Sequence, residues 1–409
     1  MTIGERRVAV TGLGAVCALG HDVPSLWRAL VAGDCGIRPI ANIPTERLTA
    51  RTAAEVLGFD PAQHFDARQL PMLDRTSQFA LVAAREAMAQ AAPNGIAAIG
   101  VDAREAGVIF GAGLGLHTID SSYQTLYGEG SNRLHPFTVP RTMPNAPASH
   151  ISIDFSLRGP SFAIATACAS STHAIGVAFH MIRSGLLEFA VTGGSDASLT
   201  IGHVRAWDAL RVLSPDACRP FSKDRTGLVL GEGAAVLVLE EWEHARARGA
   251  TIHCEIVGFG MSADAGDITA PDEGGAAQAI DAALADGNLN PADVQYVNAH
   301  GTGTRLNDRM ETAALKRVFR VHAKQLAISS TKSMLGHCLN AGGALEAAAT
   351  VLALRAGVAP PTAGYREVDT ECDLDYLPNS ARRMPIDAAL SNSFAFGGFN
   401  AVLALRKTR

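Results

Sequence analysis

Two segments far apart in the sequence share one pattern, and this weak internal repeat constrains the fold more than any single element. Residues 231–240 (GEGAAVLVLE) resemble residues 397–406 (GGFNAVLALR): each follows a Gly/Ser-rich turn and continues as an apolar run typical of a closing strand. A small-residue segment leading into a helical pattern lies upstream of each, at 167–185 and at 335–357. Two such halves meeting back to back would give a five-layer α/β/α/β/α body. Strand–glycine–helix units also recur in unrelated α/β proteins, so the repeat alone leaves duplication and coincidence equally open.

Apolar, β-branched runs alternate with Ala-rich helical patterns along the chain. Such alternation is typical of α/β proteins, in which helices cover sheets. The sequence therefore predicts strands at 8–11, 107–110, 189–192, 234–240, 252–258, 295–298, 327–330, 388–391 and 401–405, and helices at 78–90, 171–184, 275–285 and 342–355.

The charge balance excludes several classes of protein. The 409 residues carry 35 Lys+Arg against 40 Asp+Glu, a formal net charge of −5 without a basic block, which argues against nucleic acid as the main partner. With 47% apolar and 18% charged residues, the chain has ample material for a buried core and lies far from the disordered class. No run of about 18 apolar residues is free of charge or glycine, so no membrane-spanning helix is expected.

The N-terminal segment and the cysteines indicate a cytoplasmic protein. The apolar stretch near the N-terminus superficially resembles a secretory signal, but glycines interrupt it, so residues 7–11 are interpreted as a first strand. The seven cysteines are scattered and form no C-x-x-C pair, which predicts neither a disulfide framework nor a zinc site. The glycine pairs in 12–14 and 111–113 do not complete a G-x-G-x-x-G motif, so nucleotide binding is disfavoured.

Cys168 is the first candidate for chemistry. It stands in the small-residue segment 166–171 (TACASS), where the strand-like run 161–165 gives way to a helical pattern. At a helix N-terminus, unpaired N–H groups and the macrodipole favour a thiolate, so the pKa of Cys168 is expected to be lowered. Its small neighbours leave room for an acyl group. A buried structural cysteine is the alternative, which the segment by itself does not exclude.

His300 is the second candidate. It follows a predicted strand in the segment 298–304 (NAHGTGT), whose glycines and threonines permit close approach of a ligand. Asp308 and Glu311, three residues apart, fall on one face of the next helical turn and could hold nearby groups by hydrogen bonds. A lone histidine after a strand is usually structural, but the Gly/Thr loop favours a functional one.

Two further segments follow predicted strands or turns. Lys332 and His337 lie five apart in 330–337 (STKSMLGH), at a strand–loop–helix junction, where taken alone a surface charge and a helix-terminal histidine would explain them. Residues 392–400 (NSFAFGGFN) form a Gly-rich turn flanked by aromatic residues. Its backbone N–H groups could bind a developing oxyanion, or simply form a turn.

Together these segments resemble the β-ketoacyl–acyl carrier protein synthases, specifically the elongating type II condensing enzymes of the thiolase superfamily. The resemblance implies a thiolase-like α/β fold of five layers, α/β/α/β/α, with two pseudo-symmetric halves. Residues 1–250 would form the half with the nucleophilic cysteine, and residues 251–409 the half with both catalytic histidines. The motifs that carry the resemblance run nearly from end to end, at 8–14, 73–77, 158–160, 166–168, 193–196, 219–221, 231–233, 300–304, 330–333, 336–337 and 392–394.

The resemblance also implies roles for individual residues. Cys168 matches the acyl-accepting nucleophile, His300 and His337 the two catalytic histidines, Lys332 the structural lysine beside them, and Glu311 the acidic residue that orients this network. The remaining matches are the aromatic gate Phe396, whose backbone N–H would form an oxyanion hole with that of Cys168, the pantetheine-binding Thr302 and Thr304, the chain-tunnel positions Leu114, Gly202 and Val204, and a monovalent-cation site of some relatives at Asn298, Glu346, Ser391 and Asn392. No other cofactor is implied.

The implied reaction is a decarboxylative Claisen condensation that gives 3-oxoacyl–acyl carrier protein. An acyl group on the cysteine is attacked by the enolate of malonyl–acyl carrier protein, whose oxygen two histidine donors would stabilise. Two histidines favour the elongating type over an initiating Cys-His-Asn enzyme. The expected partners are an acyl carrier protein bearing acyl or malonyl groups, with Arg68 and Arg211 as candidate contacts, and a second copy of the chain, or else a related subunit.

The gate departs from the usual pattern. Elongating enzymes usually have Gly-Phe-Gly-Gly-Thr-Asn there, whereas this chain has Ala395 and the bulky Phe399 in place of the first glycine and the threonine. These changes should alter loop flexibility and access to the acyl pocket. Similar substitutions occur in the specialised nodulation-type condensing enzymes, so either fatty acid synthesis or a specialised fatty acyl or polyene product is plausible.

Three other activities fit the sequence less well. A biosynthetic thiolase needs a second active-site cysteine near the C-terminus, and residues 391–400 contain none. A non-catalytic, chain-length-setting partner subunit usually lacks the nucleophile, which is present here as Cys168. A cysteine hydrolase would leave the lysine motif and the second histidine unexplained.

Overall fold

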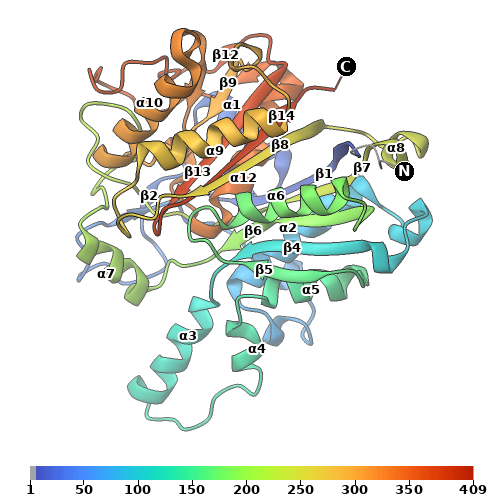
Figure 1. Ribbon diagram of the computed structural model, residues 1–409. Helices are drawn as coiled ribbons and strands as arrows, with labels where there is room; N and C mark the ends of the chain where they lie inside the picture. The colour runs from blue at the N-terminus through green and yellow to red at the C-terminus, as the bar shows by residue number, and fades with distance from the viewer. Residues whose placement is uncertain (1–5, 409) are drawn as a thin grey trace.

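A ten-stranded mixed sheet forms the centre of the computed structural model, which describes residues 6–408 (Figure 1). The strand order is β10-β9-β13-β14-β8-β1-β7-β6-β4-β5. The strands are β1 (Val8–Cys17), β4 (Ala106–Ala112), β5 (Ser161–Ile164), β6 (Phe189–Asp196), β7 (Gly233–Glu241), β8 (Cys254–Ala263), β9 (Tyr296–Asn298), β10 (Ala327–Ser329), β13 (Ala388–Ala395) and β14 (Phe399–Arg406), with two separate short pairs, β2 (Arg38–Pro39) with β3 (Thr52–Ala53) and β11 (Val358–Ala359) with β12 (Arg382–Arg383).

The sheet consists of two halves with the same connectivity. In the first half β1 pairs antiparallel with β7, β7 antiparallel with β6, and β6, β4 and β5 run parallel. In the second half β8, β14, β13, β9 and β10 repeat this pattern in the same order. The halves join where Val8–Val10 of β1 pairs antiparallel with residues 254–256 of β8. The repeat noticed in the sequence is thus a structural one, because β7 and β14 hold equivalent places.

Helices complete the five layers. The helices α6 (Ser170–Arg183) and α12 (Gly342–Ala356) pack on each other between the two half-sheets (Figure 1). The outer faces are covered by α2 (Arg75–Ala91) and α5 (Ala146–Phe155) on one side and by α9 (Glu273–Asp286) and α10 (Arg305–Phe319) on the other. The predicted α/β/α/β/α architecture is therefore confirmed. The other helices are α1 (Val23–Ala32), α3 (Leu116–Tyr123), α4 (Thr138–Thr142), α7 (Ile201–Leu210), α8 (Trp242–Ala247) and α11 (Lys332–Leu335).

Glycines let helices approach the central strands at equivalent places in the two halves. A Cβ atom on Gly14 of β1 would lie 1.8 Å from the carbonyl oxygen of Ala83 in α2. A Cβ atom on Gly260 of β8 would lie 2.0 Å from the carbonyl oxygen of Ala279 in α9. Both distances are far below van der Waals contact, so each helix lies directly on a bare backbone. The glycines near the N-terminus therefore serve packing.

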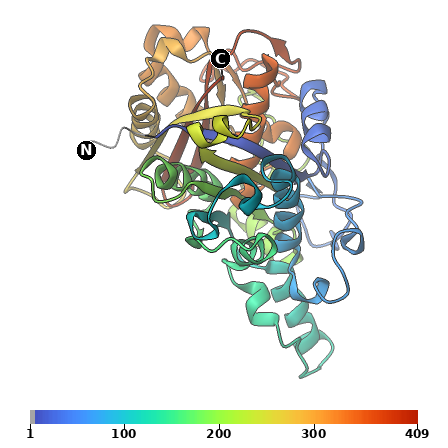
Figure 2. The ribbon, with the colours of Figure 1, turned by 90° about the vertical axis from the view of Figure 1, so that its right-hand side faces the viewer.

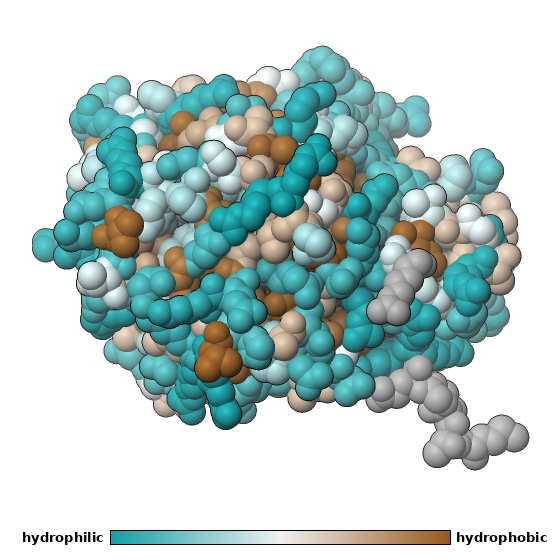
Figure 3. Space-filling view, turned by 90° about the horizontal axis from the view of Figure 1, so that it is seen from above, coloured by the Kyte–Doolittle hydropathy of each residue, from teal (hydrophilic) through white to brown (hydrophobic). Residues whose placement is uncertain are grey.

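A segment containing α3, α4 and the turn between them, residues 114–143, projects from the body (Figures 1 and 2). Its exposed apolar side chains continue onto α5 and the edge strand β5, at Leu114, Tyr123, Tyr127, Leu134, Phe137, Val139, Met143, Ile153 and Phe162. The upper face of the molecule is by contrast mainly hydrophilic, with small separate apolar patches (Figure 3). In the described part of the chain, no helix has the length and apolar character needed to cross a membrane.

Candidate active site

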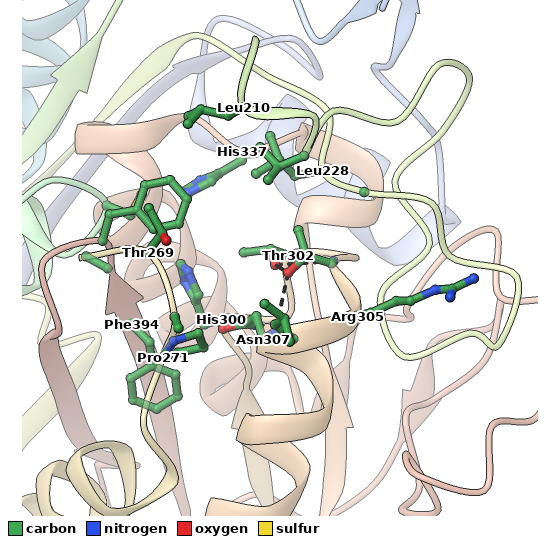
Figure 4. A pocket seen from close by; sticks show the side chains of 18 of the residues that line it. Leu210, Leu228, Thr269, Pro271, His300, Thr302, Arg305, Asn307, His337 and Phe394 are labelled. Atoms are coloured by element: carbon green, nitrogen blue, oxygen red, sulfur yellow. Dashed lines mark hydrogen bonds between the residues drawn. The ribbon is translucent and has the colours of Figure 1, made fainter. Parts of the chain in front are cut away.

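Cys168, His300 and His337 line one cavity of about 540 Å³. Figure 4 shows the two histidines in it. Cys168 precedes the central helix α6 of the first half. His300 follows β9 and His337 follows α11, both in the second half. The fold thus brings the three predicted catalytic side chains together from positions up to 169 residues apart (337 − 168). A reaction centre shared by a thiol and two imidazoles is the result.

The thiol stands on a strained turn, the nucleophile turn (residues 166–168). Ala167 has φ +48°, in the left-handed region that residues other than glycine rarely adopt. Burial raises the pKa of the Cys168 thiol to about 12, although the charge of Lys332 acts in the opposite direction. The lowered pKa expected from the helix N-terminus is therefore wrong for the resting site, because desolvation of the thiolate outweighs the helix terminus. Cys168 rests as a neutral thiol.

His300 is fixed through its backbone and its ring. The carboxylate of Glu311 accepts from the N–H of His300 at 2.9 Å and from the N–H of Gly301 at 2.7 Å. Lys332 Nζ lies 3.3 Å from His300 Nδ1. Because an ammonium group can only donate, Nδ1 must accept, and the ring proton sits on Nε2. His300 thus has an N–H that it can donate to a bound substrate.

His337 is held by backbone contacts to the first half. Its N–H donates to Val229 O at 2.7 Å, and its carbonyl oxygen accepts from Gly231 N at 3.0 Å. Both of its ring nitrogens are buried without a hydrogen-bond partner in the described structure. The ring stands nearly perpendicular to that of His300, with centroids 5.4 Å apart. A substrate oxygen can therefore meet both imidazoles.

Both imidazoles are neutral at physiological pH. Burial, aided by the charge of Lys332, holds the pKa of His300 and the pKa of His337 well below the ordinary value.

Lys332 forms a buried ion pair with Glu346. Glu311, predicted to orient the whole network, holds the loop at His300 and the side chain of Asn392, at 3.1 Å from the Asn392 amide nitrogen. The acid that pairs with the lysine is thus a residue that the sequence assigned to the cation site.

The four residues predicted to hold a monovalent cation each contribute an oxygen atom without a partner. Asn298 Oδ1, Ser391 Oγ, Asn392 Oδ1 and Glu346 Oε2 are buried and take part in no hydrogen bond in the described structure. Asn298 is the register partner of Ser391 across β9 and β13, and its amide nitrogen lies 3.3 Å from the Glu346 carbonyl oxygen. Oxygen donors suit a hard cation, so the residues present fit one. Within residues 6–408, no cluster of three or more His, Cys, Asp or Glu side chains forms a metal site.

The Gly-rich turn after β13 covers one side of the cavity. The ring of Phe396 stacks on Trp207, with centroids 5.8 Å apart. Trp207 donates its indole N–H to His203 at 2.8 Å. Gly397, with φ +86°, donates its N–H to Ile268 O at 2.7 Å, so the turn is tied to the loop between β8 and α9. The predicted gate residue is therefore braced by two other segments.

The predicted substrate-binding residues separate into two groups. Thr302 and Thr304 line the cavity with their hydroxyl oxygens 2.9 Å apart, and Arg211 lies at its rim (Figure 4 labels Thr302). Leu114 and Phe399 do not line it: they are 50% and 40% exposed, and the Phe399 ring covers Gly397. Gly202 and Arg68 also lie outside the cavity of this single chain, and Val204 packs in the apolar cluster that contains Cys168.

Sequence reasoning missed several lining residues. Trp207, Leu228 and the loop 267–271 contribute much of the cavity wall, and Arg305 extends outward from its rim (Figure 4 labels Leu228 and Arg305). These are chemically ordinary residues that only the fold brings to the site. Trp207 and Leu210, three residues apart in the helical pattern at 201–210, form a short apolar stripe, and this signal in the sequence could have indicated a wall of the cavity.

Comparison with known proteins gives the family. The family model described as "Beta-ketoacyl synthase, N-terminal domain" matches residues 5–245, and the one described as "Beta-ketoacyl synthase, C-terminal domain" matches residues 253–366. The chain belongs to the β-ketoacyl synthase family. The relatives of this β-ketoacyl synthase include Nodulation protein E of Rhizobium sp. (strain N33), 50% identical over 98% of this chain and 100% of the relative.

Two further comparisons agree with that family. The 3-oxoacyl-[acyl-carrier-protein] synthase 2 of Coxiella burnetii (strain RSA 493 / Nine Mile phase I) is 42% identical over 98% of this chain and 99% of the relative. The solved structure described as "The ishigamide ketosynthase/chain length factor" matches with a TM-score of 0.94 at 35% identity, covering 99% of this chain and 100% of that one. The resemblance inferred from the motifs, including its nodulation-type branch, and the thiolase-like fold are confirmed.

Proposed function

We propose that this β-ketoacyl synthase is an elongating condensing enzyme, which joins an acyl group held on Cys168 to malonyl–acyl carrier protein and releases carbon dioxide. The observation that carries the proposal is the shared cavity of Cys168, His300 and His337. A thiol accepts and releases acyl groups, and two neutral imidazoles stabilise an enolate. A cysteine hydrolase would need only one histidine, and the second would then have no role in the reaction.

The first half-reaction moves the acyl group onto the enzyme. The Cys168 sulfur attacks the carbonyl carbon of an acyl thioester, the bond to the carrier thiol breaks, and the thiol proton of Cys168 passes to that leaving sulfur. Because burial raises the pKa of the resting thiol, its proton must be lost as the substrate binds. The charge of Lys332, which lowers the pKa of the Cys168 thiol, eases that loss.

The second half-reaction forms the carbon–carbon bond. The malonyl thioester oxygen would lie between the two imidazoles, with His300 donating from Nε2. Loss of carbon dioxide leaves an enolate whose negative oxygen these donors stabilise. The enolate carbon attacks the acyl–cysteine carbonyl, the carbon–sulfur bond breaks, and the cysteine takes up a proton. The product is a 3-oxoacyl–acyl carrier protein.

The product is a fatty acyl or specialised unsaturated acyl chain. The relative named 3-oxoacyl-[acyl-carrier-protein] synthase 2 supports an acyl product, and the similarity to Nodulation protein E supports a specialised one. Two departures from the usual gate support a specialised substrate: Ala395 lines the cavity, and the Phe399 ring packs over Gly397.

The proposed partners are an acyl carrier protein and a second copy of the chain. Arg211 at the cavity rim, with the more distant Arg68, would meet the acidic carrier. The exposed apolar projecting segment (residues 114–143) and the edge strand β5 would meet the second copy. In a heterodimer, a related subunit would take that place; the solved ishigamide protein is described as a ketosynthase/chain length factor. The cytoplasmic location and the division at residue 250 stay predictions.

A monovalent cation is proposed at the cluster of unpartnered oxygens on Asn298, Ser391, Asn392 and Glu346. When bound, the cation would supply positive charge that holds together the oxygen ligands from β9, from β13 and from Glu346, the partner of Lys332. The protein residues alone carry the reaction steps given above.

Acylation of the purified chain tests the proposed function. The wild type incubated with a radiolabelled acyl–carrier should become labelled, and the Cys168→Ser variant should not, because a serine hydroxyl in this site lacks an activating base positioned for it. A matched Cys338→Ser variant, whose buried sulfur lies outside the cavity, should label as the wild type does. Normal labelling of Cys168→Ser would show that Cys168 is not the nucleophile and would refute the proposed function.

A further inference from the structure

A chain of hydrogen bonds links the nucleophile turn to the second half of the molecule. Asn340 donates from Nδ2 to Asp196 at 2.6 Å, and its Oδ1 lies 3.0 Å from the hydroxyl of Ser170. That hydroxyl accepts from the N–H of Thr166 at 2.9 Å, and its one proton is shared between Asn340 Oδ1 and the carbonyl oxygen of Ala167, which lies 2.6 Å away. The chain therefore ends on the two residues that precede the nucleophile.

The pseudo-symmetry explains why an amide faces this turn. Ala167 (φ +48°) and Leu339 (φ +44°) are both non-glycine residues in the left-handed region. Each stands three residues before a central helix, α6 or α12. Asn340 thus occupies, in the second half, the position that Cys168 occupies in the first. One strained turn presents the nucleophile, and its counterpart presents the amide that holds this turn. We call the hydrogen-bonded chain of Asp196, Asn340 and Ser170 the brace.

The far end of this chain is buried and well satisfied: Asp196 and Ser170 are buried, and Asn340 between them is partly buried. Asp196 accepts from the N–H of Ser198 at 2.9 Å as well as from Asn340. Burial raises the pKa of Asp196 to about 6, so the carboxylate is charged at neutral pH and its bond to the amide is charge-assisted. A Cβ atom on Gly113 would lie 2.6 Å from Asn340 Nδ2, so the bare glycine leaves room for the amide. The amide therefore has a fixed orientation, with its oxygen toward Ser170.

His337, the histidine nearest to Asn340 in the sequence, is held independently of the brace. The backbone of His337 is bonded to Val229 and Gly231, and not to any member of the chain from Asp196 to Ser170. A strained φ persists only where the surroundings over-determine it, so loosening the brace relaxes the turn before Cys168 first. The placement of His337 would not change with it.

We propose that Asn340 is a positioning residue for acyl loading. Through Ser170 it fixes the strained turn that presents Cys168 to the acyl thioester. The proposal rests on the proposed function, because acyl loading is the step on which it acts. It separates the two half-reactions: the first depends on the brace, and decarboxylation at the histidines does not.

The Asn340→Ala variant tests this separation. Acylation by an acyl–carrier, followed by intact-protein mass spectrometry, should slow at least tenfold, while carbon dioxide release from malonyl–carrier changes less than threefold. Thr172→Val is the matched control, since it removes another buried link between the halves, the 2.7 Å contact of Thr172 with the Ser393 hydroxyl. That variant should unfold at a lower temperature yet acylate within twofold of the wild type. Equal slowing of acylation in both variants would show that the brace contributes only to the stability of the fold, and it would overturn the proposal.

A reversed pair distinguishes positioning from stability. Asn340→Asp alone sets two carboxyl groups against each other and should slow acylation. Adding Asp196→Asn restores an amide–carboxylate bond with its polarity reversed, and should return acylation to within about threefold of the wild type. A double variant that stays as slow as Asn340→Asp would contradict the proposal.

Hydrogen exchange gives a readout that needs no substrate. In Asn340→Ala, the amide of Thr166 should exchange faster because its acceptor, the Ser170 hydroxyl, is no longer held. Amides around His337 should exchange as in the wild type. If the wild type takes no acyl group but this exchange pattern appears, the proposed function fails and the brace stands; unchanged exchange at Thr166 overturns the brace.

Discussion

The charge of Lys332 acts on several groups of the active site at once. It lowers the pKa of the Cys168 thiol, where it opposes burial, and it lowers the pKa of His300 and of His337, where it adds to burial. One buried ammonium group therefore eases formation of the thiolate and keeps both imidazoles neutral. These are the protonation states that the two half-reactions need.

Replacing Lys332 by methionine should shift both kinds of group in a known direction. Without the cation the pKa of Cys168 rises further, so at a given pH below it the thiolate fraction falls, about tenfold per pKa unit. Alkylation by iodoacetamide should slow accordingly across the pH range. The pKa of His300 and of His337 should move up toward the ordinary value, so the acid limb of the decarboxylation profile moves to higher pH. An alkylation profile that matches the wild type would contradict this account.

The ion pair of Lys332 with Glu346 is buried, and breaking it should be costly. In Glu346→Gln the ammonium group loses its acid, and an uncompensated buried charge costs about 3–5 kcal/mol in the free energy of unfolding. The matched control is Glu367→Gln, which breaks an exposed pair with Lys223 whose side chains are 61% and 54% accessible. That change should cost less than about 1 kcal/mol. Denaturant titration measures both, and equal costs would show that the buried pair is not a charged one.

Residue roles could be predicted where a local motif carries them. Cys168, His300 and His337 stand in distinctive segments, and the structure brings them to one cavity. The pKa of Cys168 was beyond sequence reasoning because a helix terminus is a local feature, whereas burial depends on the whole fold. Asn340 gave no signal, since its partners lie 144 and 170 residues away along the chain.

At the scale of elements, the sequence predicted the central strands but often not their ends. The first strand was expected at 8–11 and runs to Cys17, because the glycines taken as interruptions lie within β1 and pack against α2. The strand expected at 388–391 continues to Ala395, through the polar residues of the active site. Alternation and apolar runs in a sequence indicate buried strands. They do not show where a strand ends when its last residues are polar because they reach a functional site.

The glycines of β1 and β8 give an element-scale prediction. Gly14→Ala and Gly260→Ala each place a methyl group against a helix backbone, at 1.8 and 2.0 Å from a carbonyl oxygen, so α2 or α9 must move away. Each should lower the free energy of unfolding by about 1–3 kcal/mol or more. The control Gly202→Ala in α7 meets nothing within 4 Å and should be neutral or stabilising by up to about 1 kcal/mol. Denaturation midpoints check this, and tolerance at Gly14 would mean that α2 does not lie on bare backbone.

At the scale of the whole molecule, the repeat in the sequence left duplication and coincidence equally open, and the resemblance carried by the motifs predicted the two halves. It could not show how the halves join, because the pairing of Val8–Val10 with residues 254–256 crosses the predicted boundary at 250. The reaction centre likewise belongs to neither half, since its thiol and imidazoles come from different ones. The two halves therefore act as one catalytic unit.

The projecting segment (residues 114–143) gives a prediction for the assembly. Its exposed apolar side chains, with Tyr127 80% accessible, should be covered by a second copy in solution. Sedimentation should show a dimer for the wild type, and Tyr127→Asp with Val139→Asp should shift it toward monomer. The control is Val321→Asp, at an equally exposed position outside the segment, which should stay dimeric. A wild-type monomer at micromolar concentration would refute this assignment of the surface.

The most direct test of the account is the fate of the acyl group in a His337→Ala variant. Intact-protein mass spectrometry should show the acyl adduct on Cys168 after loading, as in the wild type. When malonyl–carrier is added, the wild type should lose the adduct and release carbon dioxide, while the variant should keep the adduct and release carbon dioxide about 10²–10³-fold more slowly, the usual cost of one oriented donor. Loss of the adduct with carbon dioxide release at the wild-type rate would contradict the shared role of the thiol and the two imidazoles.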